Sequence, residues 1–519
     1  MKTGCRILRI LCGLLALLML TGCSRASVPF TPEQPSVTLG PAEHPYEAPP
    51  IGSGLETQTT VNLYLPSRDG TRLLARQQTL TLARGERNAR AVLQALFARG
   101  GDDYVRALAG PTRLSLYGAS PVETSGNVCT INLASSAHAL EYDEIYTVGL
   151  AAAATLEGIS GIRYVNVLIN DQAISYDVAG NLPAGSMTAR PGEELPLLWE
   201  QMSARRTALG GDPSVTPLSA TATLYFPTAD GTGFLPETRN LTFPGQTPAQ
   251  MATELLSAMS AGAWYVDGCA TMPDINALLL FPPQVSELPE GGRLITLYFP
   301  ADFRERMTDM GLDTACFTAS VVWTLSTFIP SVGAVRIYTG SALMDSLDSG
   351  VFGAQAFEEG MIRRRYFREG LRDNAHILLA RDGKLVRMRR SVAAADAENP
   401  TTMLALMMAG PGGEEQALRV QPVLPQGLDA TDILSIGLEN GVLLVNLSPR
   451  FEREIRRLGG EEERLCCYAL VNSLCDAMGT TRVRFFWNGE QKETLAGTVW
   501  WDGEFLVNHA LDEQGGQGL

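Results

Sequence analysis

Apolar and polar positions recur in the same order at three places along the chain. The clearest copies are LYLPSRDGTRLL at 63–74 and LYFPTADGTGFL at 224–235, which share Leu, Tyr, Pro, Asp, Gly, Thr and the final Leu. A weaker copy, ILLARDGKLVRM at 377–388, keeps the Asp-Gly pair but lacks the proline. Because Asp-Gly between two apolar runs favours a turn, each stretch predicts a β-hairpin.

A short amphipathic helix is predicted after each hairpin, since apolar residues return there at helical spacing. These residues are Ala89, Val92, Leu93, Leu96 and Phe97, then Ala252, Leu255, Leu256 and Met259, then Leu404, Met407 and Met408. Pro248 and Pro400 lie near the predicted helix starts, where proline is tolerated. The apolar stripe of each helix is expected to cover a sheet.

Two further strands, a longer helix and a last strand complete each copy. The most regular strands are predicted at 126–135, 291–300 and 440–449. The longer helices carry Thr155-Leu156, Thr324-Leu325 and Ser473-Leu474, and the last strands carry 165–167, 335–337 and 483–485. The pattern therefore predicts an α+β protein of tandem small modules, each ordered strand-strand-helix-strand-strand-helix-strand.

At about 150 residues per domain, a chain of 519 residues is expected to hold three or four domains. The expected modules are repeat 1 (59–186), repeat 2 (218–345) and repeat 3 (374–515), joined by connectors at 187–217 and 346–373. Residues 1–22 are predicted to be a signal peptide, and 23–58, rich in Pro and polar residues, an extended tether.

The signal peptide prediction rests on a basic start and on ILCGLLALLML at 10–20, which is too short to span a bilayer. LTGC at 20–23 resembles the lipobox of bacterial lipoproteins, which implies lipidation of Cys23; the alternative is a plain signal peptide. Removal of 1–22 takes away Lys2, Arg6 and Arg9 and no acid, which lowers the net charge from −15 to −18. Such a charge disfavours nucleic acid and anionic membrane surfaces as partners.

One uncharged stretch, 314–335, raises the question of a transmembrane helix. Its Thr, Ser and Pro residues, and the charges in the equivalent segments of the other copies, favour a buried helix followed by a turn and a strand. Cys467 and Cys475 fall on the apolar face of a predicted helix, which favours buried thiols, although a disulfide stays open.

The sequence contains no recognisable nucleophile with a base, no metal-ligand spacing and no cofactor motif. We therefore expect a protein that is not an enzyme and that has no metal site or cofactor. Asp69, Asp230 and Asp382 are interpreted as turn residues, and the 461–463 glutamates as the acidic start of a helix.

The connector at 346–373 holds the only dense group of cations, whose members are Arg363, Arg364, Arg365, Arg368 and Arg372. One interpretation is a solvated linker helix. The alternative is an interaction patch for an acidic partner or an anionic envelope polymer.

The whole arrangement resembles the GerM-type domain of sporulation and spore germination. The resemblance rests on the LY-x-P hairpins, the helix that leads to Gly410-Pro411, the VNLSPRF segment at 445–451 and the Thr-Leu helix. Two departures are that Gly110-Pro111 is displaced by an insertion and that repeat 2 has no Gly-Pro after its first helix.

The resemblance implies a non-catalytic lipoprotein, anchored at the outer face of the bacterial cytoplasmic membrane. It further implies a scaffold or interaction role in sporulation or germination, with envelope or sporulation-channel proteins as partners and no nucleic acid. The alternative is a general envelope lipoprotein that binds peptidoglycan or a solute, unrelated to sporulation.

Overall fold

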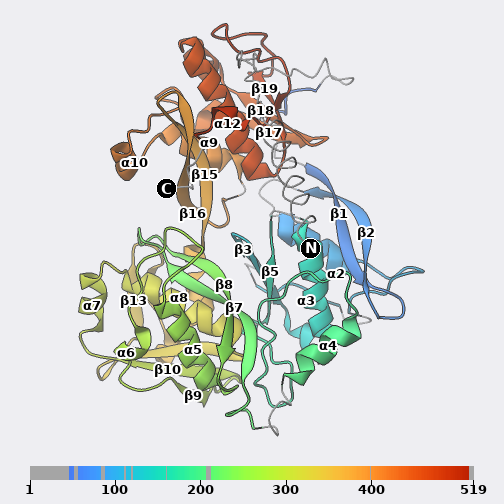
Figure 1. The fold of residues 1–519 in the computed structure, drawn as a ribbon, viewed down its shortest axis with the longest axis vertical. Helices are drawn as coiled ribbons and strands as arrows, with labels where there is room; N and C mark the ends of the chain where they lie inside the picture. Colours follow the sequence, from blue (N-terminus) through green and yellow to red (C-terminus); the bar gives the residue numbers. More distant parts are fainter. Residues whose placement is uncertain are drawn as a thin grey trace, which may run out of the picture. The chain divides into compact units, whose positions relative to one another are not determined.

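The computed structural model describes residues 46–51, 57–82, 88–109, 113–118, 121–158, 161–205, 212–397 and 399–513 (Figure 1). The predicted signal peptide, Cys23 and Gly110-Pro111 lie outside these residues. The chain divides into two units, Met1–Leu39 and Gly40–Leu519, and every described residue belongs to the second.

Repeat 1 follows the predicted order of elements. It runs through β1 (Thr57–Pro66), β2 (Leu73–Leu82), α2 (Asn88–Ala98), β3 (Val122–Ser125), β4 (Val128–Leu133), the 3-10 helix η1 (Ser135–Ala139), α3 (Tyr142–Glu157), β5 (Tyr164–Ile169) and the short β6 (Gln172–Ala173). The connector after it contains α4 (Leu195–Ala204), where the sequence predicts a short helix.

Repeat 2 has the same order with short additions. It contains β7 (Leu218–Pro227), β8 (Phe234–Phe243), α5 (Pro248–Ser260), α6 (Ile275–Leu278), β9 (Gln284–Glu287), β10 (Arg293–Phe299), α7 (Phe303–Asp309), α8 (Thr314–Phe328), β11 (Val332–Thr339) and β12 (Ala342–Leu343). The helix and strand at 314–335 are thus confirmed, and within the described residues no helix is long and apolar enough to cross a membrane.

Repeat 3 repeats the order once more. Its elements are β15 (Arg372–Arg381), β16 (Lys384–Ala393), α9 (Pro400–Ala409), α10 (Gly413–Ala417), η4 (Ala430–Asp432), β17 (Ile433–Glu439), β18 (Val442–Leu447), α11 (Pro449–Ile455), α12 (Gly460–Met478), β19 (Arg482–Trp487), β20 (Phe505–Leu506) and η5 (His509–Leu511). The α+β class and the order of elements are confirmed, while the exact boundaries of the three modules stay a prediction.

The strands of each repeat form two separate pieces of sheet. The opening hairpins are β1-β2, β7-β8 and β15-β16, all antiparallel. The later strands form mixed sheets in the orders β3-β4-β5-β6, β12-β11-β10-β9 and β17-β18-β19-β20. In each mixed sheet the two central strands are parallel, because the longer helix crosses over between them. Strand β1 also meets β17 at one residue pair, Thr57 and Leu438, which joins the repeat 1 hairpin to the repeat 3 sheet.

The Asp-Gly pairs make the hairpin turns, but in two different ways. In repeat 3, Asp382 and Gly383 alone connect the strands, both with positive φ (50° and 75°). In repeat 1 the connection is longer, and the Asp69 carboxylate accepts a hydrogen bond from the Thr71 backbone N–H at 3.0 Å. Hydrogen bonds from Ser67 and Thr71 lower the pKa of Asp69 to about 2, so the carboxylate that organises this turn is ionised. The interpretation of these aspartates as turn residues is confirmed.

A hydroxyl group at the same place in each longer helix holds the first strand of the hairpin. Thr155 Oγ1 accepts the backbone N–H of Tyr64 at 3.0 Å, and Thr324 Oγ1 accepts that of Tyr225 at 2.9 Å. In repeat 3, Ser473 Oγ accepts the backbone N–H of Leu378 at 3.2 Å. The matched Thr/Ser-Leu positions of the sequence are thus the points where helix and hairpin join.

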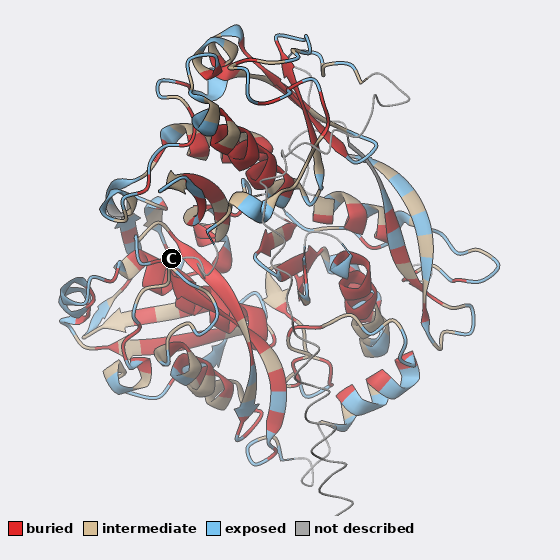
Figure 2. Ribbon diagram, turned by 45° about the horizontal axis from the view of Figure 1, so that its top comes forward, coloured by how far each residue is buried: buried red, intermediate tan, exposed pale blue. Residues whose placement is uncertain are grey.

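Figure 2 shows the buried residues in red, and their apolar side chains form two main cores. One extends without interruption through repeats 1 and 2 and the connector between repeats 2 and 3, and a second belongs to repeat 3. The connector contributes β13 (Ser346–Ser349), β14 (Gly353–Ala356) and the 3-10 helices η2 (Glu358–Gly360) and η3 (Arg364–Gly370). Its buried residues Phe352, Phe357, Ile362 and Phe367 belong to the first core. The interpretation of this connector as a solvated linker helix is therefore wrong.

The described end of the predicted tether is not an isolated extended segment. Tyr46 and Ala48 pack against an apolar cluster of repeat 3 formed by Val442, Leu444 and Phe486. The Arg484 guanidinium lies 5.4 Å from the centre of the Tyr46 ring. The Ser435 hydroxyl donates a hydrogen bond to the Pro49 carbonyl at 2.6 Å. Residues 46–51 thus cover one face of the repeat 3 sheet.

Candidate functional site

The connector arginines do not form a shared exposed patch. Arg363 pairs with Glu290, Arg368 pairs with Asp171 at 2.6 Å, and Arg372 donates to Ser391 at 3.3 Å. Arg365 is the exposed member, and its guanidinium lies 5.4 Å from the Tyr366 ring centre. Internal partners therefore occupy most of the group, which speaks against the predicted interaction patch.

Arg364 is the most deeply placed of these cations, with 2% of its surface exposed. Its guanidinium stacks 3.5 Å from the centre of the Trp323 ring and donates to Thr327 Oγ1 at 2.6 Å. It also pairs at 2.5 Å with Glu123, which lies on β3 of repeat 1. Arg364 thus links repeat 1 to the long helix of repeat 2, which is a structural role.

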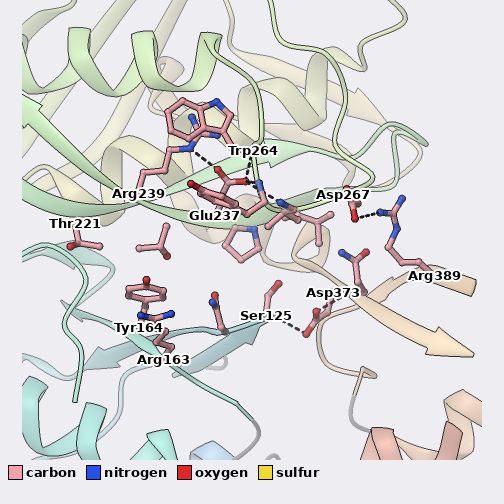
Figure 3. Close-up of a pocket in the computed structure, with 18 of the residues that line it drawn as sticks. Ser125, Arg163, Tyr164, Thr221, Glu237, Arg239, Trp264, Asp267, Asp373 and Arg389 are labelled. Atoms are coloured by element: carbon pink, nitrogen blue, oxygen red, sulfur yellow. Dashed lines mark hydrogen bonds and ion pairs between the residues drawn. The ribbon is translucent and has the colours of Figure 1, made fainter. Parts of the chain in front are cut away.

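A cavity of about 870 Å³ lies where residues of all three repeats meet, and this is the candidate site (Figure 3). Repeat 1 contributes the 125–127 turn and the start of β5, and repeat 2 contributes β8 and the 264–267 loop. Repeat 3 contributes residues of β15 and β16. In Figure 3, Ser125, Arg163 and Tyr164 stand on one wall, with Glu237 and Arg239 on the facing wall.

A buried ion pair shapes the repeat 2 wall. Glu237 and Arg239, two residues apart on β8, are 2% and 4% exposed and pair at 2.5 Å. The second Glu237 oxygen accepts three backbone N–H groups, from Trp264 at 2.8 Å, Tyr265 at 2.7 Å and Val266 at 3.1 Å. Arg239 in turn donates to the carbonyls of Ala258 and Gly262. Successive side chains of a strand point to opposite faces. Glu237 and Arg239 therefore face α5, where Arg239 bonds Ala258, and Thr238 and Asn240 point to the opposite face of β8.

The ion pair fixes a loop that presents two aromatic side chains to water. Trp264 is 61% exposed and Tyr265 78%, and their rings meet edge to face with centres 6.3 Å apart. The Arg239 guanidinium lies 4.0 Å from the centre of one Trp264 ring face. On the facing wall, Arg163 lies 5.5 Å from the centre of Tyr164. The loop is therefore held rigidly while its aromatic groups remain accessible.

Three arginines and three acidic residues line the cavity: Arg163, Arg239 and Arg389, and Glu237, Asp267 and Asp373. Arg239 pairs with Glu237 and Arg389 with Asp267. Burial, followed by repulsion from Arg387, lowers the pKa of His376, so that its imidazole is neutral at neutral pH. Neutral hydrogen-bonding groups dominate the rest: Ser125, Asn127, Thr221, Thr238, Asn240 and Asn374. Such a lining suits a polar ligand that has an apolar face and few charges better than a densely charged polyanion.

The described residues contain no group of three or more His, Cys, Asp or Glu placed to hold a metal ion. The cysteines among the described residues are free thiols. Cys467 and Cys475 are buried on α12, as predicted. Burial raises the pKa of Cys475 to about 12, which keeps this thiol protonated at neutral pH. These thiols act as apolar packing groups.

Sequence reasoning missed the residues that shape the cavity. The signal that could have found them is the Trp-Tyr pair at 264–265, an uncommon pair of large aromatic residues inside a Gly-containing loop. The 461–463 glutamates lie in the first turn of α12, which confirms their interpretation as the acidic start of a helix, but the sequence does not reveal that Glu463 also holds a loop. Glu463 is 0% exposed and accepts hydrogen bonds from the backbone of Ala496 and Thr498 and from the indole of Trp501.

Comparison with known proteins gives one family match: the Germane family, described as sporulation and spore germination, matches residues 371–493. No curated protein matches the chain. The tandem GerMN domains of the sporulation protein GerM from Bacillus subtilis are 16% identical, with 59% of this chain and 99% of that chain covered and a TM-score of 0.22. A putative lipoprotein from Clostridium perfringens is 12% identical, with 26% and 85% covered and a TM-score of 0.19. The first GerMN domain of GerM is 17% identical, with 26% and 97% covered and a TM-score of 0.17.

Proposed function

We propose that this chain, whose residues 371–493 match the Germane family, is a lipid-anchored interaction protein of sporulation or germination. The family match is the observation that carries this proposal. In the proposed role the chain performs no reaction itself and holds other envelope or sporulation-channel proteins in place. The site of action is the outer face of the cytoplasmic membrane, with Cys23 as the lipidated residue.

Two features support an interaction role. The family description names a process and no reaction. Three buried charged groups stabilise the structure: Glu237 and Glu463 accept hydrogen bonds from loop backbone, and Arg364 pairs with Glu123 of repeat 1. Groups used in this way rigidify a surface, and rigid surfaces bind partners with a smaller entropic cost.

Deletion of the gene in its host tests the process. We expect a large drop in heat-resistant spores or in their germination, with recovery when the wild-type gene is returned. Unchanged counts would exclude the sporulation role and leave the chain as a general envelope protein.

Replacement of Cys23 tests the anchor separately. Cys23→Ala should move the chain from the membrane fraction to the soluble fraction of lysed cells, because two acyl chains are what stable anchoring requires. Cys269→Ala is a matched control, since this thiol lies in the folded repeats. Retention of Cys23→Ala in the membrane fraction would contradict lipidation at this residue.

The cavity favours a second candidate function, the binding of an envelope component such as peptidoglycan or a solute. Its volume of about 870 Å³ falls within the range of ligand sites. This function requires no sporulation role and can coexist with one.

A further inference from the structure

The cavity combines accessible aromatic rings with neutral hydrogen-bonding groups, and this combination indicates a class of ligand. A sugar ring presents C–H groups on its faces and hydroxyl groups around its edge. Aromatic side chains pack against such faces, and amide and hydroxyl side chains bond the edge. Tyr164, Trp264 and Tyr265 supply the rings, and Asn127, Thr221 and Asn240 are among the groups that supply hydrogen bonds.

The rigidity of the aromatic loop is the second argument. Three backbone N–H groups of the loop are bonded to one carboxylate, and the indole of Trp264 stacks on a buried guanidinium. Desolvating the buried Glu237–Arg239 pair costs free energy. The two aromatic rings that this pair holds remain exposed to water, so their burial does not offset that cost. Rigid Trp and Tyr side chains instead give contact area to a ligand at small entropic cost.

Arg163 adds a charge that the protein itself does not neutralise. It is exposed, and its guanidinium forms no ion pair with a described residue; the guanidinium lies 5.5 Å from the centre of the Tyr164 ring, while the backbone N–H donates to the Asn127 carbonyl. The other two arginines of the cavity are paired: Arg239 with Glu237 at 2.5 Å and Arg389 with Asp267 at 3.5 Å. Arg163 is therefore available to a carboxylate carried by the ligand.

We propose that this cavity binds a glycan strand of N-acetylated sugars that carry carboxylate groups, the chemistry of bacterial peptidoglycan. Trp264 and Tyr265 pack against sugar faces, the amide and hydroxyl side chains bond hydroxyl and acetamido groups, and Arg163 pairs with a carboxylate. This inference rests on the second candidate function and is independent of the sporulation role.

The test uses the full-length chain in detergent micelles, with purified peptidoglycan sacculi and chitotetraose as probes. We expect the chain to sediment with sacculi and to bind chitotetraose in a titration followed by tryptophan fluorescence. Trp264→Ala and Tyr265→Ala should each weaken both interactions about twofold to tenfold, the range of one aromatic contact. Arg163→Gln should weaken binding to sacculi and leave chitotetraose, which has no carboxylate, unchanged.

Trp500→Ala is the matched control, because this indole is 52% exposed and does not line the cavity. Its binding should equal that of the wild type, and circular dichroism should show all four variants folded. The proposal is overturned if the wild type binds neither probe, if both aromatic variants bind like the wild type, or if cellotetraose, which lacks acetamido groups, binds as well as chitotetraose. Spore counts of the deletion strain are a separate readout, so failure of glycan binding and failure of the sporulation role are distinguishable.

Discussion

At the scale of single residues, the carboxylate of Glu237 has two tasks, since it neutralises Arg239 and bonds the backbone of the aromatic loop. Glu237→Ala would leave a guanidinium buried without its partner and three N–H groups without an acceptor. We expect a loss of about 3–5 kcal/mol in the free energy of unfolding, measured by urea denaturation. The Trp264 fluorescence should change as well, because its loop loses its anchor.

The exposed pair Arg190–Glu193 is the control for this prediction, since both side chains are about half exposed (47% and 45%). Glu193→Ala should cost less than about 1 kcal/mol. The double variant Glu237→Leu with Arg239→Met should recover stability relative to Glu237→Ala, because no charge is then left buried. A Glu237→Ala protein as stable as Glu193→Ala would disprove the account of this pair.

The contribution of the Thr324 hydroxyl to stability can also be measured, because a second buried threonine on α8 serves as a control. Thr324→Val keeps the shape but leaves the Tyr225 N–H without its acceptor, which should cost about 1–3 kcal/mol of unfolding free energy. Thr318 lies on the same helix, is 0% exposed, and its hydroxyl has no partner among the described residues. Thr318→Val should therefore be neutral or stabilising in the same urea titration. Equal effects of the two changes would show that the hydroxyl bond to the hairpin contributes nothing.

At the scale of elements, the sequence predicts regular strands and helices well, and predicts poorly the segments whose partners are distant. The 2.0 and 3.6 residue periods are local properties, so the hairpins, α5, α8 and α12 follow from them. The sequence also placed Thr155, Thr324 and Ser473 at equivalent positions without revealing that each accepts a strand N–H.

The connector shows why the rest could not be predicted. A run of arginines ordinarily indicates exposure. Arg364 is buried because Glu123, which lies 241 positions away along the chain, and the Trp323 ring meet it in space. The cavity was missed for the same reason, since its walls come from three repeats and the sequence gives no sign of which loops meet. Trp264 and Tyr265 alone were visible as an unusual pair.

The connector gives a prediction of its own, in which two neighbouring arginines behave in opposite ways. Arg364→Met removes the nearer of the two arginines that pair with Glu123, the other being Arg368 at 3.7 Å, and should lower the free energy of unfolding by about 3–5 kcal/mol. Arg365→Met changes an exposed side chain and should stay within about 0.5 kcal/mol of the wild type. The measurement is urea unfolding of both variants. If Arg365→Met were the more damaging change, the assignment of Arg364 as the link between repeats 1 and 2 would fail.

At the scale of the whole molecule, three similar repeats do not make three equal folding units. Repeats 1 and 2 share one continuous core, and their contact includes a buried polar group in which Asn166 donates to Thr223 at 3.1 Å and accepts from Ser186 at 2.7 Å. Repeat 3 has its own core. Fully bonded polar groups of this kind favour one arrangement of the two repeats over others.

This division predicts where destabilisation will spread. Leu325 and Leu470 are both 0% exposed, the first in the shared core and the second in the repeat 3 core. Replacement of either by Ala should cost about 2–5 kcal/mol. The measurement is hydrogen exchange followed by mass spectrometry. Leu325→Ala should speed exchange in β4 and β10 and leave β18 unchanged, whereas Leu470→Ala should speed exchange in β18 and leave β4 and β10 unchanged. The reason is that local opening follows cooperative units. If both variants instead sped exchange equally in all three strands, the chain would unfold as one unit, and the contacts between repeat 3 and the others would be as strong as its own core.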